Sequence, residues 1–325
     1  MTFTLRHRPF VPADAVFFAR WLIDESGSSD ETARAFEPAL RSLFERERMK
    51  GVIIERLEDD EGGRWQPLAG GISGFVVPDA ITAHLCAPTP FLMAQLLQRS
   101  AADAAAVFLD HDAIARGNSS GGLDLLLHWI QLGWDLMDPL WRAVGTMAHE
   151  AYVRDHRGYR VNRIMHEDWE REVDVYLMTG YRIFATFDLS HIPSPPGAKA
   201  GVSLRHLYYS QPDESLRVAP GTTVSHVLQY APPRCRFAPA EQRLLRLAVA
   251  GQTDQQIMTA LDLSQNTIKG TWRSIYDRIQ THAPFVLADT GDEREATGRG
   301  PEKRRRVIAF VIAHPQELRP YHWPR

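Results

Sequence analysis

Lysine and cysteine are both scarce in this chain of 325 residues. The two cysteines, Cys86 and Cys235, supply neither a disulfide framework nor a set of zinc ligands. No lysine occurs between Lys50 and Lys199, and a phospho-receiver domain needs a lysine near its end. The shortage of these two residue types therefore argues against a disulfide scaffold, a zinc-bound domain and a phospho-receiver.

Long apolar runs are also missing from the sequence. No stretch approaches the roughly 18 apolar residues that a membrane-spanning helix needs, and the opening MTFTLRHRPF lacks the apolar core of a signal peptide. Residues 307–313 are apolar and follow a basic run, but they are too few for a membrane tether. We therefore expect a cytoplasmic protein with no membrane partner.

Charge is divided unevenly along the chain. Residues 234–325 contain 15 Lys and Arg against 10 Asp and Glu, a net charge of +5. The whole chain carries −3, so the first 233 residues carry −8. A basic segment on an acidic body favours binding to the phosphate backbone of DNA. The apolar content of 44% is ordinary for a globular protein, and the length allows two domains.

The stretch 237–279 reads FAPAEQRLLRLAVAGQTDQQIMTALDLSQNTIKGTWRSIYDRI and contains three helical patterns. We predict the first helix at about 240–250, with a leucine-rich apolar face. Gly251 follows where a left-handed helix end is easily adopted. Thr253 then opens the second helix, and together with Gln256 it forms a T-x-x-Q capping box.

The third helix is predicted at about 265–280, with Ser264 as its cap. Apolar residues spaced by four, three and four positions pack inward: Ile268, Trp272, Ile275 and Ile279. Polar and basic residues remain on the outer face near the helix N-terminus: Gln265, Asn266, Thr267, Lys269, Gly270 and Arg273. The recognition helix of a helix-turn-helix protein reads DNA with this end. The alternative is a three-helix interaction module whose third helix has a solvated face.

This segment resembles the LuxR-type (GerE-type) helix-turn-helix family over about 43 residues. The family's pattern of residues is matched as follows: Glu241 and Gly251 in the first helix and its end, then Ser264, Thr267, Ile268 and Lys269, then Ile275 and Ile279. The resemblance implies a four-helix domain that binds double-stranded DNA, is usually dimeric and regulates transcription.

The chain departs from the family's pattern in three respects. Thr271 stands where the family often has His. Gly270 lies inside the recognition helix, where glycine costs about 1 kcal/mol relative to alanine. The chain also continues for 45 residues beyond Gln280, and residues 301–318 have a helical pattern.

The remainder predicts a mixed N-terminal domain, α+β or α/β, over residues 1–190 that senses a signal or holds a dimer. Strands are expected at 2–6 and 51–56 and helices at 13–23, 31–48 and 140–156, whereas 66–77 and 123–134 fit either type. The turn-rich residues 191–233 are predicted to be a linker, and 234–325 the DNA-binding domain with its helical extension.

The run RDHRGYR at 154–160, predicted to lie between two helices, resembles part of the layout of GNAT acetyltransferases. That resemblance implies a glycine loop whose backbone amides hold the pyrophosphate of coenzyme A at a helix N-terminus. The candidate ligand-binding residues are therefore Arg157, Gly158, Tyr159 and Arg160. Asp155 and Arg160 occupy positions where the family has Gln or Arg and a small residue, so we expect no enzyme activity and no cofactor. The alternative is a basic helix connection broken by glycine.

Aromatic residues are concentrated in the same half of the chain: Trp129, Trp134, Trp141, Trp169, Tyr152, Tyr159 and Tyr176. They fit a pocket for a small molecule, and core packing explains them equally well. Acidic and histidine residues cluster at 110–112, 149–150 and 166–168 without the spacing of a metal site. We expect these three clusters to be solvated and to bind no metal.

The sequence as a whole predicts a DNA-binding transcriptional regulator that forms a homodimer and responds through its N-terminal domain, with a small molecule as a candidate ligand. Thr267, Lys269 and Arg273 are the expected DNA contacts, and Gln265 and Asn266 are candidates for reading base edges. One alternative is a degenerate GNAT-like acyl-CoA-binding protein or acyltransferase whose C-terminal module only localises it. Another is a protein that uses the three helices to dock a partner.

Overall fold

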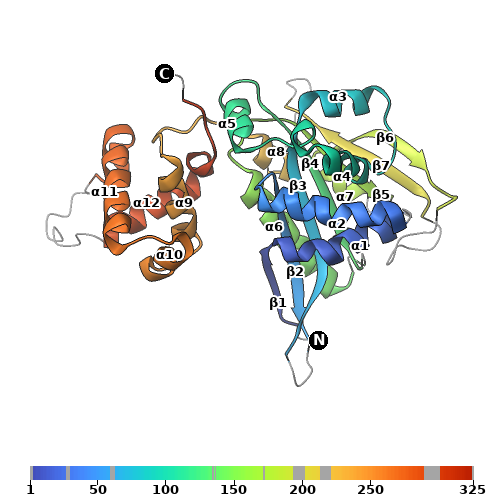
Figure 1. Ribbon diagram of the computed structural model, residues 1–325, viewed down its shortest axis with the longest axis horizontal. Helices are drawn as coiled ribbons and strands as arrows, with labels where there is room; N and C mark the ends of the chain where they lie inside the picture. Colours follow the sequence, from blue (N-terminus) through green and yellow to red (C-terminus); the bar gives the residue numbers. More distant parts are fainter. Residues whose placement is uncertain are drawn as a thin grey trace.

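A seven-stranded mixed sheet forms the centre of the protein (Figure 1). The computed structural model describes residues 3–26, 30–58, 63–133, 135, 137–170, 173–192, 202–212, 221–288 and 301–323. The strand order is β1-β2-β3-β4-β5-β7-β6. The strands are β1 (Leu5–Pro9), β2 (Met49–Leu57), β3 (Trp65–Val76), β4 (Leu123–Gln131), β5 (Val161–Trp169), β6 (Arg182–Asp188) and β7 (Leu204–Ser210).

Helices cover both faces of this sheet because alternate strand residues point to opposite sides. The first face is packed by α1 (Ala15–Ser26), α2 (Asp30–Glu45), α3 (Pro78–Cys86) and α4 (Leu92–Ala102). The second face is packed by α5 (His111–Ser119), α6 (Pro139–His156), α7 (Val173–Met178) and α8 (Thr223–Leu228). This arrangement confirms the expected mixed α/β class.

Glycines in β3 allow aromatic rings to lie against the strand on both faces. A Cβ atom on Gly70 would lie 3.1 Å from the Phe18 ring in the first layer. A Cβ atom on Gly71 would lie 2.6 Å from the Trp129 ring in the second layer. Bulkier residues would push both rings away from the sheet, so these positions set the thickness of both layers.

Strands β4 and β5 form a parallel pair that separates along its length. Their pairing starts at Leu123 with Val161 and ends at Leu127 with His166. Both strands continue further, β4 to Gln131 and β5 to Trp169, without pairing to each other, while the other edge of β5 pairs with β7 from Ile164 to Trp169. The sheet is therefore split between the ends of β4 and β5, and side chains from both faces approach this split.

The prediction that residues 191–233 form a linker is wrong. It contains β7, which pairs with both β5 and β6, and α8, whose Val224 and Val227 are fully buried. The sheet domain therefore extends beyond residue 190 to about the end of α8. The parts of the predicted linker at 193–201 and 213–220 lie outside the described residues.

The C-terminal part consists of helices in the described residues from 234 on. These are α9 (Pro239–Val249), α10 (Asp254–Leu261), α11 (Gln265–His282) and α12 (Pro301–Ala313). Leu244, Ile257 and Ile268 from the first three helices are buried with Val307 and Val311 from α12. The apolar residues of α12 therefore pack onto the three preceding helices.

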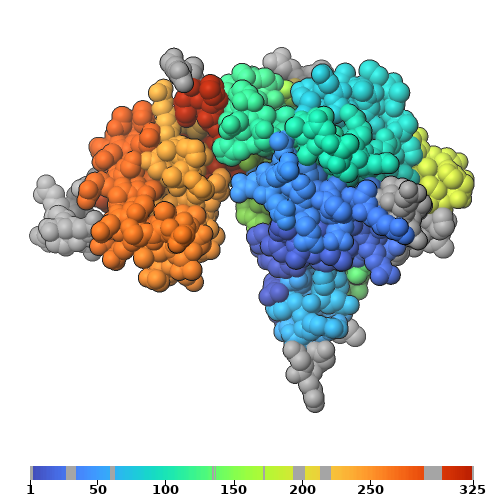
Figure 2. Space-filling view, in the orientation of Figure 1, coloured from blue at the N-terminus to red at the C-terminus, as the bar shows by residue number. Residues whose placement is uncertain are grey.

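The chain's last turn connects the two parts. After α12 the chain forms a short 3-10 helix, Pro315–Leu318, and the following residues lie beside α5, where the N–H of His322 donates to the carbonyl of Ala115. The buried Glu317 accepts hydrogen bonds from the backbone N–H groups of Arg234 and Cys235. Asn118 of α5 donates to the carbonyl of Pro320 at 2.9 Å. Figure 2 shows this red segment beside α5, at the junction of the two parts.

Candidate functional site

The N-terminal half of α11 presents a polar face to solvent. The six residues predicted to contact DNA, namely Gln265, Asn266, Thr267, Lys269, Gly270 and Arg273, are all exposed. Ile268 and Trp272 between them are buried. The sequence pattern thus correctly separates the two sides of this helix.

The helix ends and caps between α9 and α11 form as the sequence predicts. Gly251 ends α9 with a φ of +81°. Thr253 and Gln256 form the expected capping box, with the Thr253 N–H donating to Gln256 Oε1 at 2.8 Å. Asp262 adopts a left-handed conformation in the turn between α10 and α11, and Ser264 Oγ caps α11 by accepting from the N–H of Thr267.

The candidate ligand-binding run Arg157 to Arg160 lies elsewhere than predicted. It joins α6 to β5 rather than two helices. A helix C-terminus presents carbonyl groups, so it offers no cradle of amide donors to a pyrophosphate. A Cβ atom on Gly158 would lie 2.5 Å from the backbone nitrogen of Gln316, and Arg319 donates to the carbonyl of Arg157 at 2.9 Å. The run therefore forms the seam between the two parts of the chain.

Beneath this seam, the half-buried Lys50 pairs with the buried Tyr159, with Lys50 Nζ 2.6 Å from the Tyr159 hydroxyl. Burial lowers the pKa of Lys50, and the cation of Arg319 lowers it further. Burial on its own raises the pKa of Tyr159, but Lys50 and Arg319 outweigh it and the pKa is lowered. Arg160 adds a backbone N–H bond to Asn118 Oδ1. All these contacts are made within the chain and stabilise its fold.

The cluster at 166–168 is buried, contrary to the expectation of a solvated cluster. His166, Glu167 and Asp168 are between 1% and 4% exposed because they lie in β5 inside the sheet. Glu167 accepts from the backbone N–H groups of Phe91 and Leu92 and so caps the N-terminus of α4. On the other face, Asp168 accepts a 2.6 Å hydrogen bond from Tyr176.

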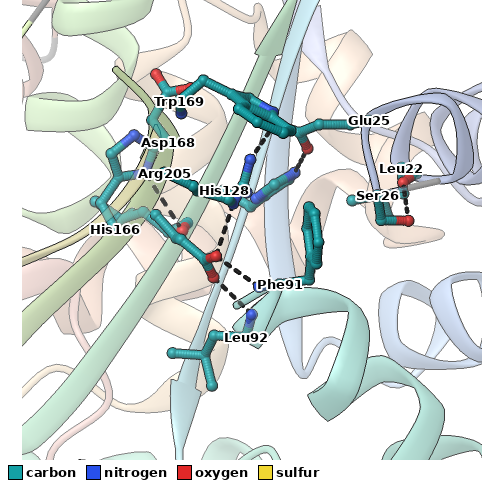
Figure 3. A network of polar contacts seen from close by, with 12 residues as sticks. Leu22, Glu25, Ser26, Phe91, Leu92, His128, His166, Asp168, Trp169 and Arg205 are labelled. Atoms are coloured by element: carbon teal, nitrogen blue, oxygen red, sulfur yellow. Dashed lines mark hydrogen bonds and ion pairs between the residues drawn. The ribbon is translucent and has the colours of Figure 1, made fainter. Parts of the chain in front are cut away.

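Arg205 of β7 links the carboxylates at the split (Figure 3). Its guanidinium contacts Glu167 at 2.6 Å and Glu25 of α1 at 3.0 Å. His128 of β4 places Nε2 2.9 Å from Glu25, within ion-pair distance. Burial alone raises the pKa of Glu25, but the charges of Arg205 and His128 outweigh it and hold the pKa below its usual value. These ion pairs therefore fill the gap between the ends of β4 and β5 on the first face of the sheet.

A cavity of about 250 Å³ lies on the second face, between α6, α7 and the sheet. Four of the aromatic residues singled out above line it: Trp129, Trp141, Tyr152 and Tyr176. Of the others, Tyr159 lies in the seam, Trp169 is buried beside Phe91 on the first face, and Trp134 lies outside the described residues. Gly145 of α6 also lines the cavity, and a Cβ atom there would meet nothing within 4 Å, whereas the Trp129 ring covers Gly71 of β3.

Polar groups in the cavity wall bond to one another. His156 Nε2 lies 2.8 Å from Ser73 Oγ, and Tyr152 and Tyr181 share a hydrogen bond at 3.3 Å. His166 Nε2 lies 3.1 Å from the Tyr176 hydroxyl. Two further pairs are Thr223 with His149, and Trp129 with Gln131.

Four of the titratable wall groups, His156, His166, Tyr152 and Tyr176, have pKa values shifted in the direction that favours the uncharged form. Burial, followed by the nearby charge of Lys50, lowers the pKa of His156 to about 4. Burial also lowers the pKa of His166, and burial raises the pKa of Tyr152 and Tyr176 well above the usual value.

The N-terminus of α6 is poorly suited to hold an anion. The crossover helix α6 follows β4, so its N-terminus is where a pyrophosphate would be held. Asp138 caps that end by accepting from the N–H of Leu140 at 2.8 Å, and Pro139 has no N–H to give. A Cβ atom on Gly133 would already lie 2.2 Å from the Trp141 ring. The carboxylate and the missing donor both disfavour an anion here.

Among the described residues, no group of three or more His, Cys, Asp or Glu side chains is placed to hold a metal ion. Over the same part of the chain, every helix is too short or too polar to cross a membrane.

No family model and no curated protein matches this chain. Among solved structures, Arabidopsis thaliana NAA60 with a bisubstrate analogue is similar over 65% of this chain and 100% of its own, at 9% identity and a TM-score of 0.36. The spermidine N-acetyltransferase of Vibrio cholerae, in complex with CoA and spermine, matches 64% of this chain and 95% of its own, at 9% identity and a TM-score of 0.33. An uncharacterized protein from Bacillus halodurans matches 64% and 84%, at 13% identity and a TM-score of 0.31. At these values the likeness establishes neither family nor function.

Proposed function

We propose that this protein is a DNA-binding transcriptional regulator that uses α11 as the recognition helix of a LuxR-type helix-turn-helix. The observation that carries the proposal is the two-sided α11, whose capped N-terminal half exposes polar and basic residues above a buried apolar face. A recognition helix enters the major groove with this half.

The exposed residues divide by chemistry into two groups. Lys269 and Arg273 carry the positive charges that pair with phosphate or guanine, and Thr267 suits a phosphate or a thymine methyl group. Gln265 and Asn266 have the amide groups that read base edges. One such helix reads few bases, so we propose that the protein binds operator DNA as a homodimer.

The seam gives the sheet domain a route to control DNA binding. Arg319 donates to the carbonyl of Arg157 and to that of Arg154, both on the end of α6. Glu317, two residues earlier, holds the start of the helical part through Arg234 and Cys235. We propose that a movement of α6 is transmitted to the C-terminal helices through Arg319 and Glu317.

The test is the salt dependence of binding to DNA. Lys269→Ala should weaken binding to every DNA sequence and reduce the slope of log K against log salt concentration by about one unit. Arg20→Ala, which removes an exposed charge from α1 in the sheet domain, is the matched control. An unchanged slope in Lys269→Ala would remove this residue from the phosphate contacts.

A second candidate is a degenerate GNAT-like acyl-CoA-binding protein. The strand order and the split between β4 and β5 beside a cavity favour it, and the Asp138 cap of α6 opposes it. A binding site for acetyl-CoA should raise the melting temperature, since ligand at 100 times Kd stabilises by about 2.7 kcal/mol. No shift at millimolar acetyl-CoA would exclude this candidate.

A further inference from the structure

We propose that the cavity between α6 and the sheet binds an uncharged, apolar aromatic molecule of about ten non-hydrogen atoms, in place of a coenzyme. This inference concerns the sheet domain alone and holds whether or not α11 binds DNA.

The size of the ligand follows from the volume of the cavity. An engineered apolar cavity of roughly 150 Å³ binds benzene, which has six non-hydrogen atoms. The cavity here measures about 250 Å³. Scaling by volume gives on the order of ten non-hydrogen atoms, the size of two fused rings.

The aromatic character of the ligand follows from the walls. Trp129 of β4 and Trp141 of α6 line the cavity together with Tyr152 and Tyr176. Flat rings offer large apolar contact areas and favour stacked or edge-on contact with another ring. Gly71 holds no side chain between Trp129 and the sheet, so this ring lies against the strand.

The absence of charge on the ligand follows from the electrostatics of the walls. Within the described residues that line the cavity, Asp155 is the acid, and Arg154 pairs with it at 3.0 Å. No lysine or arginine is present among these lining residues. An anionic ligand would lose its hydration without gaining a counter-ion, and a cationic ligand would meet an acid that Arg154 already pairs, so either charge is costly in such surroundings.

The apolar character of the ligand follows from the hydrogen bonds. The pairs Ser73 with His156, Tyr152 with Tyr181 and Tyr176 with Asp168 use wall groups that would otherwise meet a ligand. A polar ligand would have to break these bonds or remain unsatisfied, and each unmet group costs about 1–3 kcal/mol.

Gly145 provides a direct way to close the cavity. It lies in α6 and lines the cavity, and a Cβ atom added to it would meet nothing within 4 Å. Gly145→Leu therefore fills the space without a backbone clash and replaces a poor helix former with a good one. Its neighbour Thr146 is exposed on the same helix, so Thr146→Leu adds the same side chain outside the cavity.

The experiment is equilibrium dialysis of the full chain against naphthalene, 2-naphthoate and acetyl-CoA. We expect one naphthalene site per chain and at least tenfold weaker binding of 2-naphthoate, which differs by its carboxylate. Gly145→Leu should lose naphthalene binding, and Thr146→Leu should keep it. Circular dichroism melting of both variants confirms that each is folded.

Several results would overturn the proposal. Binding of 2-naphthoate as tight as that of naphthalene would show that the site accepts anions. Naphthalene binding that survives in folded Gly145→Leu would place the site elsewhere. Saturable binding of acetyl-CoA that Gly145→Leu abolishes would assign the cavity to a coenzyme, and no naphthalene binding by the unmodified chain would leave the cavity without its ligand.

Discussion

Removing the guanidinium of Arg205 should strongly destabilise the sheet domain. Arg205 is 1% exposed and contacts Glu25 at 3.0 Å and Glu167 at 2.6 Å. At an effective dielectric constant of about 20, each contact contributes roughly 6 kcal/mol of attraction. The desolvation of the ions offsets much of this, and breaking a buried pair by removing one partner typically costs about 3–5 kcal/mol. We therefore expect Arg205→Met to lower the free energy of unfolding by about 4 kcal/mol at pH 7.

The loss should depend on pH with a definite sign. In the native protein, burial alone raises the pKa of Glu25, but Arg205 and His128 outweigh it and lower the pKa. Stability from this carboxylate is therefore present above its unfolded pKa and is lost as pH falls through the folded one. Without Arg205, burial raises the pKa of Glu25, so protonation relieves the variant. The gap between variant and native protein should narrow as pH falls from 7 to 5.

The assay is urea unfolding followed by circular dichroism at pH 7 and pH 5. The control is Arg41→Met, because Arg41 pairs with Glu37 on the exposed surface of α2. Exposed pairs contribute at most about 1 kcal/mol, so this variant should change little. A loss below about 1 kcal/mol for Arg205→Met, equal at both pH values, would refute the reasoning that buried charges close the split.

Three further predictions concern a histidine of the cavity wall and two glycines of the helical part. The pKa of His156 in the folded protein is about 4, against 6.5 as its ordinary value; the unfolded chain therefore binds the extra proton, and stability should fall by about 3 kcal/mol as pH drops from 6.5 to 4. His156→Gln should flatten this part of the stability curve measured by urea unfolding, and an unchanged curve would contradict the assignment. Gly251→Ala should destabilise the helical part by about 1 kcal/mol, because its φ is +81°. Gly270→Ala, where a Cβ atom meets open space, should stabilise it by about 1 kcal/mol, and the two melting shifts should have opposite signs.

The helical part follows closely from the sequence because its signals are local. The box formed by Thr253 and Gln256, the cap at Ser264 and the left-handed Gly251 each involve residues at most three positions apart. Apolar spacing in α11 then assigns one face to the core. Such features depend little on the rest of the chain.

The sheet domain is harder to predict because its contacts are distant in sequence. Strand β7 reads LRHLYYS, and its charged and polar residues suggest an irregular loop. Arg205 is nevertheless buried, because its carboxylate partners lie 38 and 180 positions away. No local pattern indicates that a charge will be neutralised by partners so far along the chain.

The cavity was predicted in part. Four of the aromatic residues that suggested a pocket do line one. The sequence does not distinguish these rings from Tyr159, which binds Lys50 in the seam, or Trp169, which packs on the opposite face. The strand order places these residues, and it depends on pairings such as β5 with β7 that leave no periodic signature.

The most direct test of the account is the capture and sequencing of genomic DNA fragments bound by the purified protein. A Lys269→Ala/Arg273→Ala double variant serves as control, because both side chains are exposed on α11 and the fold does not depend on them. We predict a small set of enriched sites that the double variant loses. Equal enrichment by the two proteins would contradict the assignment of α11 as a DNA-reading helix. So would a lack of enrichment by either protein when naphthalene, the probe for the cavity, is present.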